Sequence, residues 1–143
     1  MSILNLRGID LLENNNLYTL NYLILNMVTQ VKGLKFDPIL REGVWNTKKG
    51  LFKLVLKNDD RLFILNDKEK LVGIIGGPSK GAGSIWFWKS LVHRGESDKK
   101  CLGEYRFEEI LGRYVVTPYE NGFICQEKQE FIHPLDYLLR YLD

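Results

Sequence analysis

Three apolar segments separated by very short polar turns constrain the fold of this chain more than any other feature. The segments are 51–57 (LFKLVLK), 61–65 and 71–75, and the turns between them are Asn58-Asp59-Asp60 and residues 66–69. Asn and Asp tolerate the backbone geometry of tight turns, and connections this short join antiparallel neighbours. The sequence therefore predicts an antiparallel three-stranded meander at the centre of the chain.

A helix is predicted at each end of the chain. Between Leu17 and Val31 apolar residues recur at helical spacing, after the capping amides Asn14–Asn16 and before Gly33. Pro134 opens a second stripe that continues to Leu142. With the other apolar runs, this pattern predicts one α+β domain over residues 1–143. We expect a mostly antiparallel sheet of five to seven strands, packed by an N-terminal and a C-terminal amphipathic helix.

The remaining elements are short. Asp37 followed by Pro38 predicts a helix over Pro38–Glu42, and Phe107, Ile110 and Leu111 predict another that ends at Gly112. Residues 114–117 and 123–126 predict a hairpin. Residues 84–92 are compatible with a helix or a strand, and their aromatic and branched side chains favour a strand.

Composition indicates an ordinary globular protein. The chain has 143 residues, of which 45% are hydrophobic and 27% charged, enough for one core. It has no apolar run of about 18 residues, so no membrane span is expected, and its N-terminus lacks the pattern of a signal peptide. Cys101 and Cys125 have no partner at metal-binding spacing, which is typical of reduced thiols in a cytoplasmic protein. We expect neither a cofactor nor a metal ion.

The charge is unevenly distributed. Residues 32–100 carry 15 Lys and Arg against 8 Asp and Glu, whereas the rest of the chain carries 5 against 10. This asymmetry favours an anionic partner for the middle of the chain. The alternative is that the acidic and basic parts pack together and cancel.

A glycine-rich loop lies at the centre of the basic region. It runs from Gly76 to Ser84, and it does not match the Walker A motif, because Ala82 occupies the lysine position. Backbone N–H groups of such a loop and a nearby lysine can still hold an anion. The candidate ligand-binding residues here are Gly77, Lys80, Gly81 and Gly83. A plain turn between strands is the alternative.

Aromatic and cationic residues follow the loop. As a strand, residues 84–92 place Trp86 and Trp88 on one face and Lys89 on the other. Exposed aromatic rings stack on nucleic-acid bases, and neighbouring cations such as Lys89 and Arg94 meet phosphates. His93, Lys99 and Lys100 add to this group of candidates. The alternative is that both tryptophans belong to the core.

The first helix has an unusual second face. The 18 residues between Glu13 and Lys32 contain no charge, although solvated helix faces normally carry Lys and Glu. This favours self-association through residues 16–32, with Tyr18, Tyr22 and Asn26 at the interface. The alternative is a helix covered on both sides by its own domain.

No catalytic constellation is evident, and no catalytic residue is predicted. Lys80-Gly81-Ala82-Gly83 and the segment Pro118–Phe123 resemble motifs of the GNAT acetyltransferases. That family binds acetyl-CoA on a glycine loop that opens a helix, so the resemblance implies an acetyl-CoA-dependent transferase. We prefer a non-catalytic binding or inhibitor-like protein that engages an anionic ligand or an acidic protein surface, and we keep the transferase as the alternative.

Overall fold

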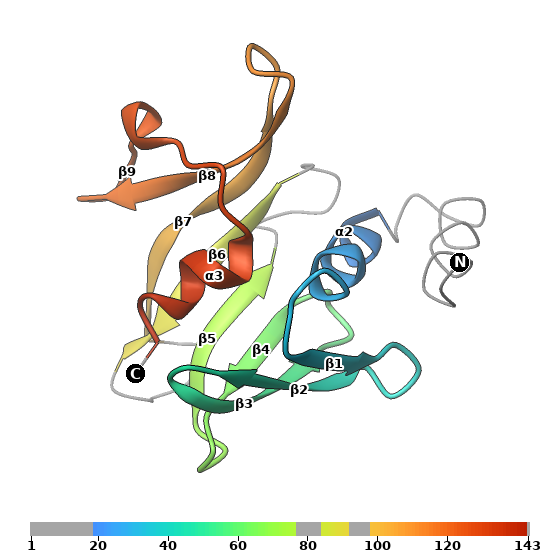
Figure 1. Ribbon diagram of the computed structural model, residues 1–143. Helices are drawn as coiled ribbons and strands as arrows, with labels where there is room; N and C mark the ends of the chain where they lie inside the picture. Colours follow the sequence, from blue (N-terminus) through green and yellow to red (C-terminus); the bar gives the residue numbers. More distant parts are fainter. Residues whose placement is uncertain (1–18, 77–83, 92–97, 143) are drawn as a thin grey trace.

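A computed structural model describes residues 19–76, 84–91 and 98–142, with the backbone alone for residues 19–23. Within these ranges the chain forms one antiparallel sheet whose nine strands follow one another in sequence order (Figure 1). The strands are β1 (Leu34–Asp37), β2 (Glu42–Thr47), β3 (Gly50–Leu56), β4 (Leu62–Leu65), β5 (Leu71–Gly76), β6 (Ile85–Ser90), β7 (Lys99–Glu108), β8 (Arg113–Glu120) and β9 (Phe123–Ile124).

Helices make a small contribution to the described residues. These contain α2 (Thr19–Val28), the 3₁₀ turn η3 (Gln126–Lys128) and α3 (Pro134–Leu139). The predicted fold class is therefore wrong in two respects. The sheet has nine strands instead of five to seven, and two short helices replace the two longer ones that were expected to pack it.

Two predicted helices are strand connections. Asp37 does accept hydrogen bonds from the N–H groups of Ile39 and Leu40, at 2.8 and 3.2 Å, as a helix cap would. The helix does not continue, because Arg41 has a φ of 59° and its carbonyl accepts from Leu56 of β3. Likewise, Gly112, with a φ of 66°, ends the β7–β8 hairpin turn and not a helix.

The core lies between the two helices and one face of the sheet, which we call the inner face. Alternate residues of the strands point to it, including Trp45, Leu54 and Phe87, and they form one cluster with residues of both helices. From α3, Tyr137 packs on Phe87 and donates to the carbonyl of Leu102 at 2.8 Å. Tyr137 is therefore a core residue.

The central meander of the sequence prediction is confirmed. β3, β4 and β5 pair antiparallel, with turns at Lys57–Arg61 and at Asn66–Lys70. In the second turn, the side chain of Asn66 accepts from two backbone N–H groups, those of Lys68 and Lys70, at 2.9 Å each. This is the physical reason why Asn predicts the turn.

Candidate functional site

The strand β6 places the two tryptophans on the face of the sheet opposite the helices, which we call the outer face. Ile85 and Phe87 are fully buried in the core, and Trp86 and Trp88 point the other way and are half-buried. Residues 85–90 are thus a strand, as their composition favours. The alternative in which both tryptophans are core residues does not hold.

Trp88 belongs to a row of cross-strand partners on the outer face. Trp88 pairs with Ile74 of β5, which pairs with Phe63 of β4. Ile74 is completely buried although it does not belong to the core cluster. The two aromatic rings therefore stand on either side of a buried aliphatic residue.

Cations surround both rings. The ammonium of Lys99 lies 4.9 Å from the centre of the Trp88 ring. Around Phe63, Lys57 lies at 5.2 Å and Arg61 at 5.1 Å. Arg61 also pairs with Asp59 at 2.6 Å, and this pairing lowers the pKa of the Asp59 carboxyl. We call the set Phe63, Trp86, Trp88, Lys57, Arg61 and Lys99 the aromatic–cationic face.

A buried polar row adjoins Trp86. Trp86 pairs across the strands with Glu104, which pairs with Thr117. Glu104 is 5% exposed, and burial raises the pKa of its carboxyl, against the opposing charge of Arg106 whose Nε lies 3.4 Å away. Trp86 Nε1, Arg106 Nε and Thr117 Oγ1 are buried without a hydrogen-bond partner among the described residues. Such groups are uncommon and often mark functional positions.

Lys89 lies apart from the tryptophans. It shares the inner face with its cross-strand partner Lys100, and both lysines line a cavity near Tyr141. The structure therefore divides the predicted ligand residues of β6 between two faces of the sheet.

Several predicted site residues lie outside the described part of the chain. These are Gly77, Lys80, Gly81, Gly83 and Arg94 of the ligand-binding set, and Tyr18 of the interface set, together with the side chain of Tyr22. Asn26 is half-buried and lines a small hollow with Gln30, Tyr105 and His133. Leu25 of the same helix is 5% exposed.

Phe63, Lys57 and Arg61 were not among the predicted site residues. The signal was present in part, because Lys57 and Arg61 flank the first predicted turn and Phe63 follows by two residues. The pairing that places Phe63 in line with Trp88 depends on the register of three strands, and this register could not be predicted from the sequence.

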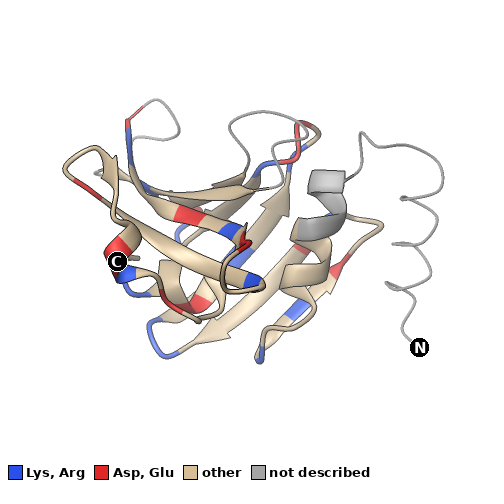
Figure 2. Ribbon diagram, turned by 90° about the horizontal axis from the view of Figure 1, so that it is seen from above, with Lys and Arg blue, Asp and Glu red and all other residues tan. Residues whose placement is uncertain are grey.

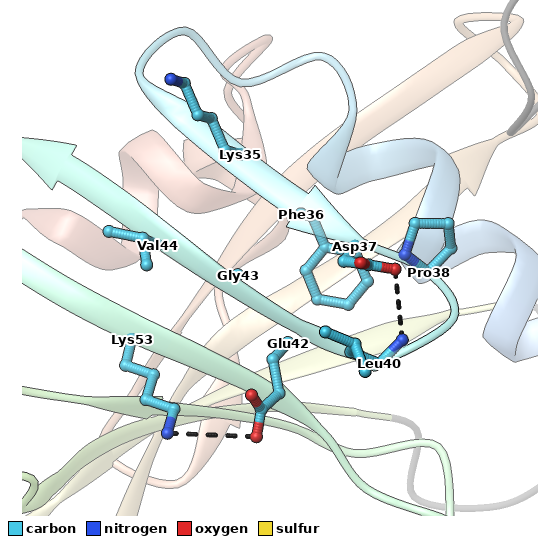
Figure 3. A pocket seen from close by; sticks show the side chains of 9 residues that line it. All are labelled: Lys35, Phe36, Asp37, Pro38, Leu40, Glu42, Gly43, Val44 and Lys53. Carbon is cyan, nitrogen blue, oxygen red and sulfur yellow. Dashed lines mark hydrogen bonds and ion pairs between the residues drawn. The ribbon is translucent and has the colours of Figure 1, made fainter.

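A second hollow lies on the outer face of β1, β2 and β3 (Figure 3). Its volume is about 570 Å³, and its lining is mostly apolar, with Phe36, Leu40 and Val44 exposed to it. Lys35, Val44 and Lys53 form one cross-strand row along it, and Lys53 lies 3.9 Å from Glu42. This hollow is open to solvent.

Charges of both signs occur over the described residues (Figure 2). Some lysines of the basic region have structural roles. Lys49 donates to the carbonyls of Arg140 and Leu142, at 3.1 and 2.8 Å, and so holds the end of α3. The excess of positive charge in residues 32–100 is therefore not wholly available to a partner.

The described residues offer little for catalysis or metal binding. Within them, no group of three or more His, Cys, Asp and Glu side chains is placed to hold a metal ion. Burial raises the pKa of the Cys101 thiol, which makes it a poorer nucleophile. His93 lies outside the described residues.

These features define a small antiparallel meander protein with an aromatic–cationic face. The chain shows no match to a protein-family model, to a curated protein or to a solved structure. Among the described helices, neither has the length and apolar character needed to cross a membrane.

Proposed function

We propose that this protein is a non-catalytic binding protein for an anionic partner, and that the partner is single-stranded nucleic acid. The observation that carries this proposal is the row of Trp88 and Phe63 on the outer face, with one cation over Trp88 and two beside Phe63. Proteins that bind single strands combine aromatic stacking platforms with positive charge that follows the phosphates.

The spacing of the two rings suits neighbouring bases. Phe63 and Trp88 are separated by one strand, so their backbones lie roughly 10 Å apart at the usual distance between strands. A base that stacks on Trp88 replaces Lys99 over the ring and leaves its ammonium free to contact the adjacent phosphate. Each base stacked in this way contributes about 1–3 kcal/mol.

The glycine-rich loop is the second part of the proposal. It connects β5 to β6, and the last residue of β5, Gly76, is paired with Trp86. The loop therefore begins next to the aromatic–cationic face. Its lysine and glycines, Lys80, Gly77, Gly81 and Gly83, are proposed as further contacts to phosphate, together with Arg94.

The acetyltransferase alternative has less support. The resemblance to GNAT enzymes implies a helix that begins at the glycine loop, where its N-terminus holds a pyrophosphate. In the structure, β6 follows that loop. Acetyl-CoA therefore serves as a control ligand, and we expect no shift of the melting temperature on its addition.

A cytoplasmic location is part of the proposal. Cys101 and Cys125 are both free thiols. Free cysteines are typical of proteins in reducing compartments.

The proposal is tested by the fluorescence anisotropy of a labelled oligothymidylate. We expect saturable binding that weakens as salt rises, because bound cations are released from the phosphates. Lys99→Ala should weaken binding about tenfold, the loss of one charge-assisted contact. The matched control is Lys70→Ala, in the exposed turn between β4 and β5.

Two results would overturn the proposal. One is the absence of binding to the oligonucleotide at low salt. The other is an equal loss of affinity in the Lys70 and Lys99 variants, which would indicate attraction by net charge alone. Binding of an acidic peptide with higher affinity than the oligonucleotide would assign the face to an acidic protein surface instead.

A further inference from the structure

The strand β1 lies at one edge of the sheet. It pairs with β2 on one side, and no strand within the described residues pairs with its other side. The N–H of Asn46 donates to the carbonyl of Gly33 at 2.9 Å, which makes these two residues a hydrogen-bonded pair. Such pairs alternate with non-hydrogen-bonded pairs along antiparallel strands. The backbone groups of Lys35 and Asp37 are therefore directed at β2, and the N–H and C=O of Phe36 are directed away from it.

An edge of this kind is a template for pairing with another strand. The backbone of β1 restricts how such a strand can pair. The N–H of Leu34 is already bonded to the carbonyl of Val31, at 3.3 Å, and Pro38, which follows the strand, has no N–H. Phe36 is thus the residue of β1 that can exchange both backbone hydrogen bonds with a partner strand, and it determines the register.

The charges on β1 are complementary to those of a second copy of the same strand. Lys35 and Asp37 flank Phe36, and both are exposed on the outer face. When two copies pair antiparallel with Phe36 opposite Phe36, Lys35 of each copy lies opposite Asp37 of the other. Opposite charges at directly facing positions stabilise a sheet.

Both charged groups are available for such a contact. Lys35 makes no ion pair with another described residue. Asp37 accepts the N–H groups of Ile39 and Leu40 through Oδ1, so Oδ2 can accept from a lysine. Ile39 and Leu40 are themselves 69% and 68% exposed, next to the end of β1. Neighbouring exposed apolar residues are typical of protein–protein contacts.

We propose that this protein forms a symmetric dimer in which the two copies of β1 pair through their outer edges. One pair of backbone hydrogen bonds joins the two Phe36 residues, and a Lys35–Asp37 ion pair lies on each side of it. The contact uses the same residues of both copies, as a two-fold interface requires. This inference goes beyond the proposed function and does not depend on it, because Trp88 and Phe63 lie on other strands.

The test is sedimentation equilibrium of the full chain. We expect twice the chain mass of 16.7 kDa for the wild type. Lys35→Glu places two carboxylates opposite each other at both ends of the contact, so it should raise the dissociation constant of the dimer about tenfold or more. The matched control is Lys70→Glu, the same change of charge in the exposed turn between β4 and β5, which should leave the constant unchanged. Unchanged melting temperatures should show that both variants fold.

A complementary variant restores the contact. Asp37→Lys alone places two lysines opposite each other and should also prevent dimerisation. In an equimolar mixture of Lys35→Glu and Asp37→Lys, every facing pair again has opposite charges, so a mixed dimer should form. Hydrogen exchange then locates the contact, because the N–H of Phe36 should exchange more slowly in the wild-type dimer than in Lys35→Glu.

The following results would overturn the inference. A wild type that is monomeric at high concentration would exclude the dimer, and equal effects of Lys35→Glu and Lys70→Glu would show that net charge alone is responsible. A dimer that persists in Lys35→Glu and dissociates in Asn26→Lys would assign the contact to residues 16–32. Slow exchange of the Phe36 N–H in monomeric Lys35→Glu would show that the chain itself covers the edge of β1.

Discussion

Lys99 and Lys100 are consecutive residues of β7 whose side chains lie on opposite faces of the sheet. Lys99 covers the ring of Trp88 on the outer face, and Lys100 lines the cavity near Tyr141 on the inner face, beside Lys89. The alternation of side chains along a strand makes this separation unavoidable. The two lysines therefore contribute to two different surfaces of the sheet. A single substitution at either lysine alters one surface and leaves the other intact.

The C-terminal helix α3 should be essential for stability. Leu138 is completely buried between the helix and the sheet. Leu138→Ala should lower the free energy of unfolding by about 2–4 kcal/mol, as expected for a large-to-small change in a core. The measurement is urea denaturation, with Ile39→Ala as a control, because Ile39 is 69% exposed. Equal midpoints for the two variants would show that α3 is not docked.

Gly103 should resist substitution. Its φ is 154°, and a Cβ at this position would lie 2.6 Å from the carbonyl oxygen of Thr117. Gly103→Ala should therefore destabilise the protein by about 1–3 kcal/mol, the range for backbone strain at a special conformation. Gly112→Ala is a useful comparison, since no atom lies within 4 Å of its Cβ position and only its φ of 66° is unfavourable. A smaller loss for Gly103→Ala than for Gly112→Ala would contradict this account.

His133 should make stability depend on pH. Its Nδ1 accepts from the N–H of Leu135 at 3.1 Å, so the proton lies on Nε2, which donates to the carbonyl of Met27 at 3.2 Å. Burial lowers the pKa of this imidazole below its ordinary value of 6.5, although Met27 and Asp136 oppose the shift. The neutral ring therefore stabilises the fold above about pH 6.5, and this contribution is lost as the pH falls through the lowered pKa.

The comparison for this prediction is His133→Asn, which keeps a capping side chain and does not titrate. Between about pH 7.5 and pH 5.5 the wild type should lose up to about 1 kcal/mol more stability than the variant. Glu104 shifts in the opposite sense, because its raised pKa favours the fold at low pH, and it is common to both proteins. Parallel pH profiles would exclude His133 as the cause.

Self-association through residues 16–32 remains a prediction. Leu25, which precedes Asn26, is buried in the domain's own core, so less of this helix surface is available to a partner. In an oligomer formed through this helix, Asn26→Lys should convert the oligomer to a monomer without unfolding, because burying an unpaired charge at an interface is costly. The measurement is the molar mass of both proteins by light scattering. A wild type that is monomeric at high concentration would contradict the prediction of self-association.

The sequence was most informative where local chemistry determines the structure. Asn66 predicts its turn because its own side chain closes that turn. Leu135 and Leu138 predict the buried face of α3 through helical spacing. Local chemistry was misleading at Asp37, because its side chain accepts the same hydrogen bonds in a turn as at the start of a helix. The hydrogen bond between Arg41 and β3 determines that the segment forms a turn and not a helix.

The candidate surfaces were predictable only in part. The alternation along β6 predicts that Trp86 and Trp88 share one face, but the sequence left open whether that face is the core, and the burial pattern of the strand decides it. Phe63 was hidden, because residues 62–65 form a continuous apolar run in which no position stands out. The edge of β1 was hidden as well, because Asp37 and Pro38 favour the start of a helix at the point where this strand ends.

The most direct test of the central claim is tryptophan fluorescence during titration with oligothymidylate. Of the three tryptophans, Trp45 is 2% exposed in the core, so quenching by a stacked base should come from the outer face. We expect strong quenching in the wild type and in Trp86→Phe, and its loss in Trp88→Phe. Quenching that persists unchanged in Trp88→Phe would contradict the proposal that bases stack on the aromatic–cationic face.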